Sequence, residues 1–360
     1  MSHADVIVVG AGIVGLLTAR ELQRRGLHVV VFERDSVGRA SSWAGGGILS
    51  PIPPWEASDA VTMLAQASES VYATLAGELA PTGIDIEYTR SGVLQLGETI
   101  GTAAVNWMRH SGAALEQVSG PALQELEPAL NLVFGTAVLL PQVAQVRNPR
   151  LLVALHRDLL RRGVDIREQN PVLGLERQSG RITGVQTDNG FVAADNVVIA
   201  AGAWSRKLVP LRVEPVRGQM LWYRYKPGVV QRILIEGDQY LIPRRDGVCL
   251  VGSTVEQTGY DASTTAVART RLEAVAARLC PALGDLQPAG QWAGLRPGSA
   301  DGVPAIGEVP GCSGLFVNTG HFRNGITLAP ASAVLLADLL TDTKPAIDPI
   351  QYSVGVQLYS

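Results

Sequence analysis

The sequence of 360 residues has few cysteines, no paired histidines and no long apolar run. Its three cysteines, Cys249, Cys280 and Cys312, form an odd set without a close pair, which argues against a disulfide framework and a CxxC metal site. The five histidines show no HxxxH or HxH spacing, so we expect no structural metal. No apolar run reaches the roughly 18 residues of a membrane span, and the first apolar run starts too early to leave room for a signal peptide. These absences predict a soluble, cytoplasmic protein.

The chain also has little excess of either charge sign. The formal net charge is −3, and the pairs Arg24-Arg25, Arg161-Arg162 and Arg244-Arg245 are scattered along the chain. This scatter is typical of solvated helix ends and a loop, and it disfavours a nucleic-acid surface. With 46% hydrophobic residues, 18% charged residues and 39 glycines, the composition is that of an ordinary α/β enzyme, large enough for one or two cores.

The first thirty-odd residues hold the pattern around which the chain is organised. Residues 6–9 (VIVV) lack polar alternation, which predicts a central parallel strand buried on both faces. A glycine-rich turn at 10–15 follows, then a helix over 16–25 and a second apolar run at 29–32 that ends in Glu33. Strand, turn, helix, strand and acid in this order predict a dinucleotide-binding unit.

Each glycine of that turn has its own physical role. Gly10 permits the tight turn, Gly12 lets a pyrophosphate approach the backbone, and Gly15 lets the helix pack closely on the strand. The free N–H groups at the start of the helix favour a phosphate. Glu33 comes 18 residues after Gly15, where a carboxylate can accept hydrogen bonds from ribose hydroxyls.

Two further glycine-containing stretches favour ligand contact. Residues 41–51 (SSWAGGGILSP) could form a flexible linker, but the apolar side chains of Trp43, Ile48 and Leu49 favour a loop pressed against a flat ligand. Residues 314–327 predict a strand, a glycine-bracketed turn and a helix that continues to Leu340. This arrangement repeats the opening unit and delivers a helix N-terminus to a polar ligand.

The remaining chain alternates helices and strands and then becomes a meander of antiparallel strands. Predicted helices cover 60–80, 123–130 (broken by Pro128), 148–163 (with Asn148 as N-cap) and 266–279. Predicted strands cover 92–96, 164–166, 172–175, 182–186, 197–200, 216–225, 232–236, 239–243 and 248–252. Antiparallel strands in an otherwise alternating chain indicate a separate sheet and therefore a second domain.

The fingerprint with Glu33-Arg34, followed by the loop from Ser41 to Ile48, resembles the D-amino-acid oxidase and sarcosine oxidase superfamily of FAD-dependent oxidoreductases, and within it the glycine oxidases. The motifs AGLRPG (293–298) and GHFRNGI (320–326) stand intact, and the resemblance extends from Val6 to about Leu340. It implies a homotetramer. It also implies noncovalent FAD, because sarcosine oxidases that link the flavin use a cysteine shortly after the AGLRPG region, and none lies there.

The resemblance and the patterns together predict an α/β (α+β) fold with two domains. A discontinuous, Rossmann-like FAD-binding domain is expected from residues 1–85, 140–212 and 297–360. A substrate domain with a mostly antiparallel sheet is expected from 86–139 and 213–296. The expected FAD contacts are Gly10, Gly12, Ile13, Val14, Gly15, Glu33, Arg34, Ser41, Ser42, Gly46, Gly47, Ile48, Val172, Ala201, Gly202, Trp204, His321, Phe322, Arg323, Asn324, Gly325, Ile326 and Thr327.

An enzyme that handles a small amino acid needs a cation for the carboxylate, and the planar fork of arginine binds a carboxylate bidentately. Arg296 and Arg323 lie in small-residue segments that we expect to be loops, and taken alone each is typical of a surface arginine. The resemblance assigns Arg296 to the substrate carboxylate and Arg323 to the flavin ring and substrate. Tyr240, which taken alone is typical of cross-strand packing, matches the family tyrosine whose hydroxyl meets the carboxylate. We expect His321 to contact the cofactor through its backbone and not to act as a base.

The reaction implied is the oxidative deamination of glycine, sarcosine or a small D-amino acid. A hydride leaves the α-carbon for flavin N5, O2 reoxidises the flavin to give hydrogen peroxide, and the imine hydrolyses to glyoxylate or the 2-oxo acid and ammonia. Family members supply the imine to thiazole synthesis in the thiamine pathway. The sequence does not rank the substrates, which depend on the pocket walls expected at Ile48, Met220, Trp222 and Tyr240.

Three other interpretations stay open. A dehydrogenase that passes electrons to a quinone or carrier should have a membrane-facing apolar or basic helix, and none is evident. A flavin-binding scaffold without turnover gains nothing from an unpaired cation in a pocket. An NAD dehydrogenase could also use Glu33, but residues 41–47 and the C-terminal turn have no place in it.

Overall fold

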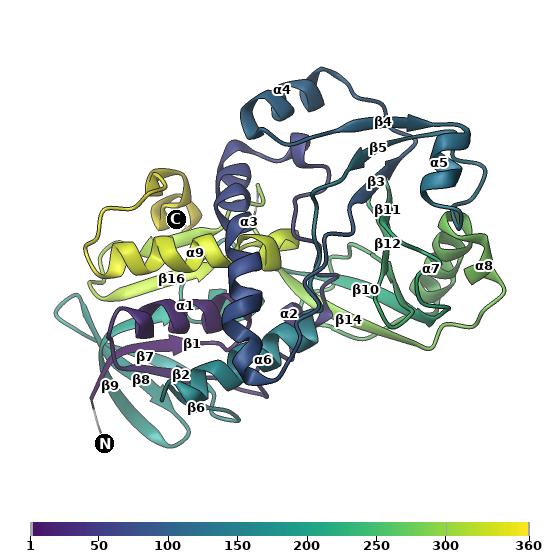
Figure 1. Cartoon of the computed structure of the whole chain (residues 1–360). Coiled ribbons are helices and arrows are strands. Elements are labelled where there is room, and N and C mark those ends of the chain that lie inside the picture. Colours follow the sequence, from purple (N-terminus) through teal and green to yellow (C-terminus); the bar gives the residue numbers. More distant parts are fainter. Residues whose placement is uncertain (1–2, 300, 359–360) are drawn as a thin grey trace.

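The computed structural model describes residues 3–299 and 301–358, and its strands form two large sheets (Figure 1). The first sheet runs in the order β15-β16-β9-β1-β2-β6, with the hairpin β7–β8 attached to β9. Its main strands are parallel, and β15 pairs antiparallel with β16. The bounds are β1 Ala4–Val9, β2 Val29–Phe32, β6 Asp165–Arg167, β7 Val172–Gln178, β8 Arg181–Thr187, β9 Gly190–Ile199, β15 Ala305–Glu308 and β16 Leu315–Thr319.

Strand β1 is buried on both faces, as its unbroken apolar run predicts. Val6 and Val8 pack into one hydrophobic cluster with the helices, whereas Ile7 and Val9 pack into another with the β7–β8 hairpin and the C-terminal segment. The helices of the first cluster are α1 Ile13–Arg24, α3 Asp59–Leu79, α6 Asn148–Arg161 and α9 Gly325–Leu340.

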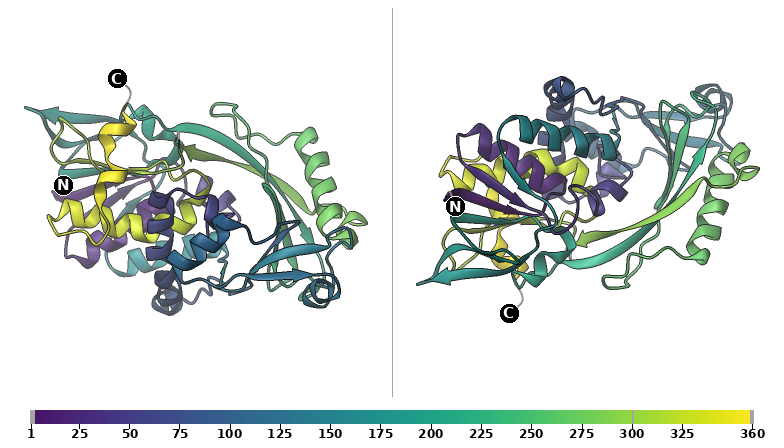
Figure 2. Two further views of the ribbon diagram at one scale, coloured as in Figure 1. Left: turned by 90° about the horizontal axis from the view of Figure 1, so that it is seen from above. Right: turned by 90° about the horizontal axis from the view of Figure 1, so that it is seen from below.

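The second sheet has the order β14-β10-β13-β12-β11-β3-β5-β4 and is antiparallel except where β11 pairs with β3. Figure 2 shows that this sheet lies to one side of the first sheet and its helices, with the long pair β10 and β14 reaching between them. The bounds are β3 Val93–Leu96, β4 Glu116–Ser119, β5 Thr136–Leu140, β10 Glu214–Arg224, β11 Ile233–Glu236, β12 Gln239–Pro243, β13 Val248–Gly252 and β14 Gly290–Gly298.

Apart from α7, the remaining helices are short. Helix α7 packs on the outer face of the second sheet in a cluster with Leu221, Leu241 and Val251. The remaining bounds are α2 Ser41–Ala44, α4 Thr102–Ser111, α5 Pro121–Leu126, α7 Ala266–Leu279, α8 Pro281–Gly284, η1 Pro54–Glu56, η2 Ala80–Thr82, η3 Gly202–Lys207, η4 Phe322–Asn324, η5 Pro349–Tyr352 and η6 Val354–Gln357.

The predicted fold class is confirmed, because one sheet is largely parallel with a nucleotide-type turn and the other is largely antiparallel. The bounds of β12, β13 and α7 agree residue for residue with the prediction. Strands β4, β5 and β15 and helix α4 were not predicted. The helix expected over 123–130 starts at Pro121 and ends at Leu126, because the proline at position 128 disfavours a helical backbone at Glu127, whose φ is −140° and ψ 83°.

Three further expectations were wrong. Arg296 lies in β14 and not in a loop, because its backbone pairs with Val216 of β10. Asn148 is not the N-cap of α6, which is Arg147; the side-chain amide of Asn148 donates instead to Ser42 O at 3.0 Å and Gly45 O at 2.8 Å. Arg244 is buried at 6% exposure and not solvated.

Cys249, Cys280 and Cys312 are all free and buried. Burial raises the pKa of the Cys249 thiol to about 12. Within residues 3–299 and 301–358, no helix has the length and apolar character to cross a membrane, and no cluster of three or more His, Cys, Asp or Glu residues could hold a metal ion.

Candidate active site

Two adjoining cavities lie where the two sheets meet. A long cavity of about 480 Å³ follows the carboxyl ends of β1, β2 and β9, and an inner pocket of about 230 Å³ opens between η4 and the hairpin β11–β12. The residues that line both cavities are Ser41, Gly45, Arg296, Phe322, Arg323 and Ile326. A molecule bound in the long cavity would therefore reach the inner pocket.

The fingerprint turn forms one wall of the long cavity. Gly10 has φ +106°, and a Cβ there would lie 2.6 Å from Ala200 O, so only glycine fits. A Cβ on Gly15 would overlap Gly10 O, which is the close packing of helix and strand that the sequence predicts. Gly12 lines the cavity at the start of α1, where the first backbone N–H groups have no carbonyl acceptor within their own helix.

Polar groups of the long cavity fit a dinucleotide such as FAD. Glu33 accepts the N–H of Ala11 at 2.8 Å and lines the cavity at the end of β2. The buried Oδ1 of Asn318, also in the lining, has no hydrogen-bond partner among the described residues. At the far end the guanidinium of Arg34 lies 3.7 Å from the ring centre of Trp204, which gives a flat wall. The glycine cradle, the helix start and the acid together match the donor set that a dinucleotide needs.

The structure brings most of the predicted cofactor residues to this junction. Those that line the long cavity are Gly10, Gly12, Ile13, Val14, Glu33, Arg34, Ser41, Ser42, Val172, Ala201, Gly202, Trp204, His321, Phe322, Arg323, Gly325 and Ile326. Gly46, Gly47, Ile48 and Asn324 line the inner pocket instead. Gly15 and Thr327 line neither cavity: Gly15 packs on Gly10, and the hydroxyl of Thr327 donates to Ile48 O at 3.0 Å.

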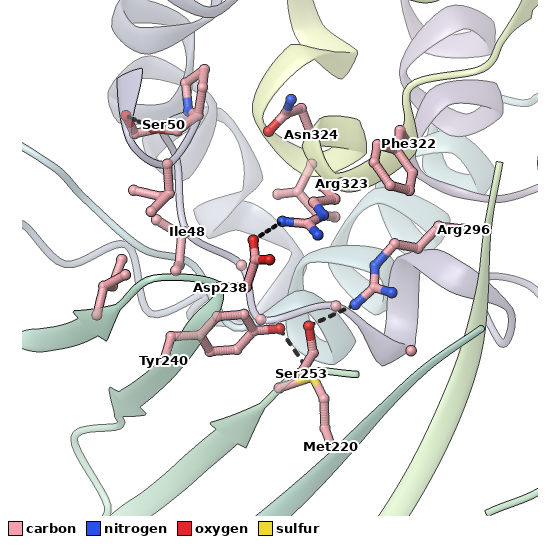
Figure 3. Close-up of a pocket in the computed structure, with 18 of the residues that line it drawn as sticks. Ile48, Ser50, Met220, Asp238, Tyr240, Ser253, Arg296, Phe322, Arg323 and Asn324 are labelled. Carbon is pink, nitrogen blue, oxygen red and sulfur yellow. Dashed lines mark hydrogen bonds and ion pairs between the residues drawn. The ribbon is translucent and has the colours of Figure 1, made fainter. Parts of the chain in front are cut away.

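Arg296 reaches the inner pocket from β14. Its Nη1 donates to Thr254 O at 3.1 Å and its Nη2 to Ser253 Oγ at 2.8 Å, and no carboxylate of the described residues pairs with it (Figure 3). The guanidinium lies over Gly218, where a Cβ would overlap it. Burial lowers the pKa of Arg296, and the neighbouring positive charge of Arg323 adds to that effect. A half-buried cation without a protein anion is a binding group for a carboxylate ligand.

Tyr240 faces the same space from β12. Its hydroxyl lies 3.7 Å from the sulfur of Met220, and Figure 3 shows it turned towards Ser253 and the Arg296 side of the pocket. A Cβ on Gly252 would lie 2.8 Å from the tyrosine ring, so the glycine makes room for it. Of the expected walls, Ile48, Met220 and Tyr240 line the pocket, but Trp222 does not.

Arg323 is not an unpaired cation. Its Nη1 pairs with Oδ1 of Asp238 at 2.5 Å, across the pocket from η4 to the turn between β11 and β12 (Figure 3). Sequence reasoning missed Asp238, because the Glu236-Gly237-Asp238 segment reads as ordinary hairpin chemistry. The signal present was an acid at the tip of a hairpin two residues before Tyr240.

His321 has no free role as a base. Its Nε2 lies 3.0 Å from Ser332 Oγ inside the first sheet's core, and burial lowers the pKa of the ring to about 3. The imidazole is therefore neutral near pH 7 and accepts a proton poorly.

The glycine-rich loop is clamped from behind by residues that sequence reasoning did not assign. Arg244 donates to Gly46 O at 2.7 Å, to Val146 O at 2.9 Å and to Gln145 Oε1 at 2.6 Å. Burial lowers the pKa of Arg244 to about 10, so the side chain stays charged near pH 7. Together with the Asn148 amide, these bonds make the loop a fixed wall and not a flexible linker.

Comparison with known proteins agrees with this geometry. The sequence model of the DAO family, described as FAD dependent oxidoreductase, matches residues 5–339. Glycine oxidase of Pseudomonas aeruginosa is 46% identical over 360 residues, which cover 98% of this chain and 99% of the relative. The bifunctional protein ThiO/ThiG of Synechocystis sp. is 35% identical, with 99% of this chain and 54% of that protein covered. The crystal structure of glycine oxidase from Geobacillus kaustophilus superposes with a TM-score of 0.92 at 30% identity, covering 98% and 99% of the two chains.

Proposed function

The chain belongs to the FAD dependent oxidoreductase family, and we propose on this premise that it is an oxidase of glycine and similar small amines such as sarcosine and small D-amino acids. The observation that carries the proposal is the guanidinium of Arg296, which has no carboxylate partner among the described residues and lies where the long cavity meets the inner pocket. The pocket volume of about 230 Å³ suits a substrate the size of a small amino acid.

The chain's own residues bind and orient the substrate. Arg296 receives the carboxylate through a charge-assisted pair, and its bonds to Ser253 and Thr254 hold the guanidinium in one orientation. The hydroxyl of Tyr240 supplies a second hydrogen bond to the same carboxylate. With the carboxylate fixed on the second sheet, the α-carbon points back towards the junction with the long cavity.

The cofactor residues have matching tasks. Glu33 is placed for the ribose hydroxyls, and the start of α1 at Gly12 is placed for the pyrophosphate. When bound, FAD would supply the acceptor for the hydride that leaves the substrate, and O2 would then take up the two electrons to give hydrogen peroxide. His321 is neutral and bonded to Ser332, so it is not available as a general base, and hydride transfer from the neutral form of the substrate amine requires none.

We extend the proposal to the product and the assembly. The imine that leaves the site hydrolyses to glyoxylate and ammonia, or serves thiazole synthesis in the thiamine pathway, as the resemblance implies and as the similarity to a ThiO/ThiG protein supports. The homotetramer rests on the resemblance alone, and the cytoplasmic location is the expectation from the sequence. Light scattering of the purified protein gives the mass of the assembly, and a monomer would remove the tetramer from the proposal.

Peroxide yield decides between the oxidase and its rivals. In air with glycine, we expect one hydrogen peroxide per glyoxylate formed. Rapid dye reduction with negligible peroxide would replace the oxidase with a dehydrogenase that serves another acceptor. A protein that carries FAD but turns over none of glycine, sarcosine and D-alanine would be a flavin-binding scaffold.

A further inference from the structure

The charges in the inner pocket are few and partly paired. Among the described residues, its lining contains three charged side chains, Arg296, Arg323 and Asp238. Asp238 comes from the tip of the hairpin β11–β12, and Arg323 comes from η4 on the opposite side (Figure 3). Their ion pair at 2.5 Å spans the pocket, with the arginine side chain 37% exposed and the aspartate side chain 65% exposed. The pair therefore lies at the open side of the pocket and Arg296 lies deeper.

The lining carries a net charge of +1, from two guanidinium groups and one carboxylate. Arg244 adds no charge to the lining, because it lies behind Gly46 with its donors taken by protein oxygens. One substrate carboxylate on Arg296 therefore neutralises the lining. A second carboxylate on the same substrate would find Arg323 already occupied and would meet the negative charge of Asp238.

We propose that Asp238 is a specificity-determining residue, which restricts the pocket to amines with a single carboxylate by occupying Arg323 and repelling a second carboxylate. The inference rests on the proposed oxidase function of the same pocket. Removal of the Asp238 charge frees Arg323 as a second anion-binding group and changes the lining from +1 to +2. Dicarboxylate amines then gain an attraction where they previously met a repulsion.

Sarcosine and iminodiacetate provide a matched pair of substrates. Both are secondary amines with one acetate arm, and iminodiacetate replaces the N-methyl group of sarcosine with a second carboxylate arm. The quantity to measure is kcat/KM for iminodiacetate divided by kcat/KM for sarcosine. We expect Asp238→Asn to raise this ratio by about three- to tenfold, because the substitution removes one partly screened repulsion and also frees Arg323 for one partly screened attraction.

The same hairpin offers a control. Glu236→Gln also removes one negative charge and also breaks an ion pair, here with Arg278 at 2.5 Å, but Glu236 does not line the pocket. We expect its ratio to stay within twofold of the wild-type value. Asp238→Ser, which shortens the side chain, should shift the ratio in the same direction as Asp238→Asn. An unchanged ratio in both Asp238 variants, or an equal rise in Glu236→Gln, would overturn the proposal.

A binding measurement separates this proposal from the oxidase proposal. Acetate and malonate are unreactive ligands with one and two carboxylates, and calorimetry or the flavin spectrum of the FAD-loaded protein gives their dissociation constants. We expect Asp238→Asn to tighten malonate relative to acetate by a similar three- to tenfold factor. If the wild-type protein oxidises neither glycine nor sarcosine, the oxidase proposal fails, and the malonate-to-acetate ratio still decides the role of Asp238. No relative gain for malonate would refute that role.

Discussion

At the scale of single residues, the carboxylate-binding group depends on a glycine that shows no chemistry of its own. Arg296 lies over Gly218 of the neighbouring strand β10, and any side chain at position 218 would take the space of the guanidinium. The Ser253 and Thr254 bonds then fix the guanidinium in that space. The position of the guanidinium therefore depends on β10, which carries Gly218, as well as on β14, which carries Arg296.

Gly218→Ala should displace the Arg296 guanidinium while leaving the fold intact, since the overlapping atoms belong to the end of a flexible side chain. We expect KM for glycine to rise roughly tenfold with FAD still bound. Arg296→Ala should raise KM further, because it removes a charge-assisted pair that contributes about 1.5–3 kcal/mol to substrate binding. Steady-state kinetics and the flavin spectrum measure both effects.

Gly174→Ala in β7 is the matched control, because a Cβ there meets only Gln186 Cβ at 3.9 Å. It should leave KM unchanged. A Gly218→Ala enzyme with wild-type KM would show that Arg296 is not held by this contact.

The buried imidazole of His321 predicts a specific pH dependence of stability. Its pKa is about 3 in the folded protein and near 6.5 in the unfolded chain, so the unfolded state binds the proton first as pH falls. The free energy of unfolding should therefore decrease as the pH is lowered from 6.5. Between pH 6.5 and 5 the loss from this group is on the order of 1–2 kcal/mol.

Chemical denaturation at several pH values tests this assignment. His321→Gln, whose amide can still bond to Ser332, should have a shallower dependence on pH than the wild-type protein. His110→Gln, at an exposed position of α4, should keep the wild-type dependence. Identical slopes for all three proteins would contradict a buried neutral imidazole at position 321.

At the scale of elements, the sequence predicts the helices and strands whose apolar runs, turns and caps lie next to one another in the chain. β12 and β13 are short apolar runs separated by turn residues, and α7 begins after Thr265, which caps it through Ala268 N at 3.2 Å. Strand β14 was missed because its small residues, which include Gly294 and Gly298, have low strand propensity. It forms a strand because β10 pairs with it over its full length, a tertiary contact that no local pattern encodes.

The glycine-rich loop is held in place by residues outside its own segment. Three glycines alone allow a mobile tether, and the structure shows a loop fixed by Arg244 and Asn148 from other segments. Those partners lie about 100 to 200 residues away, so local spacing could not reveal them. Arg244 is buried and not exposed because its guanidinium bonds to this loop and to the chain behind it.

The clamp can be tested with two adjacent arginines. Arg244→Gln removes bonds to Gly46, Val146 and Gln145, and we expect about tenfold weaker FAD or glycine binding, since a hydrogen bond to a charged group contributes about 1.5–3 kcal/mol. Arg245→Gln breaks an exposed pair with Asp85 and the bonds to Thr89 Oγ1 and Tyr88 O, none of which lines either cavity, and it should change neither binding constant. FAD titration of the apoprotein and KM for glycine give the comparison. Equal effects of the two substitutions would exclude a specific clamp.

At the scale of the whole molecule, the site exists only where the two sheets meet. The first sheet brings the fingerprint turn, Glu33 and the 320–325 turn to one cavity, and the second brings Tyr240 and Arg296 to its open end. The nucleotide half was predictable from spacing, because its turn and helix are contiguous in sequence. The substrate half was predictable by resemblance alone. The pairing of Asp238 with Arg323 was predictable from neither spacing nor resemblance, because the β11–β12 turn and η4 are 85 residues apart and approach only in the folded chain.

The central claim is that one FAD lies in the long cavity with its reactive end beside Arg296. The most direct measurement is the visible spectrum of the purified protein before and after glycine is added without oxygen. We expect a yellow protein whose flavin absorbance disappears with glycine and returns when air is admitted. A colourless protein that takes up no added FAD would contradict the account.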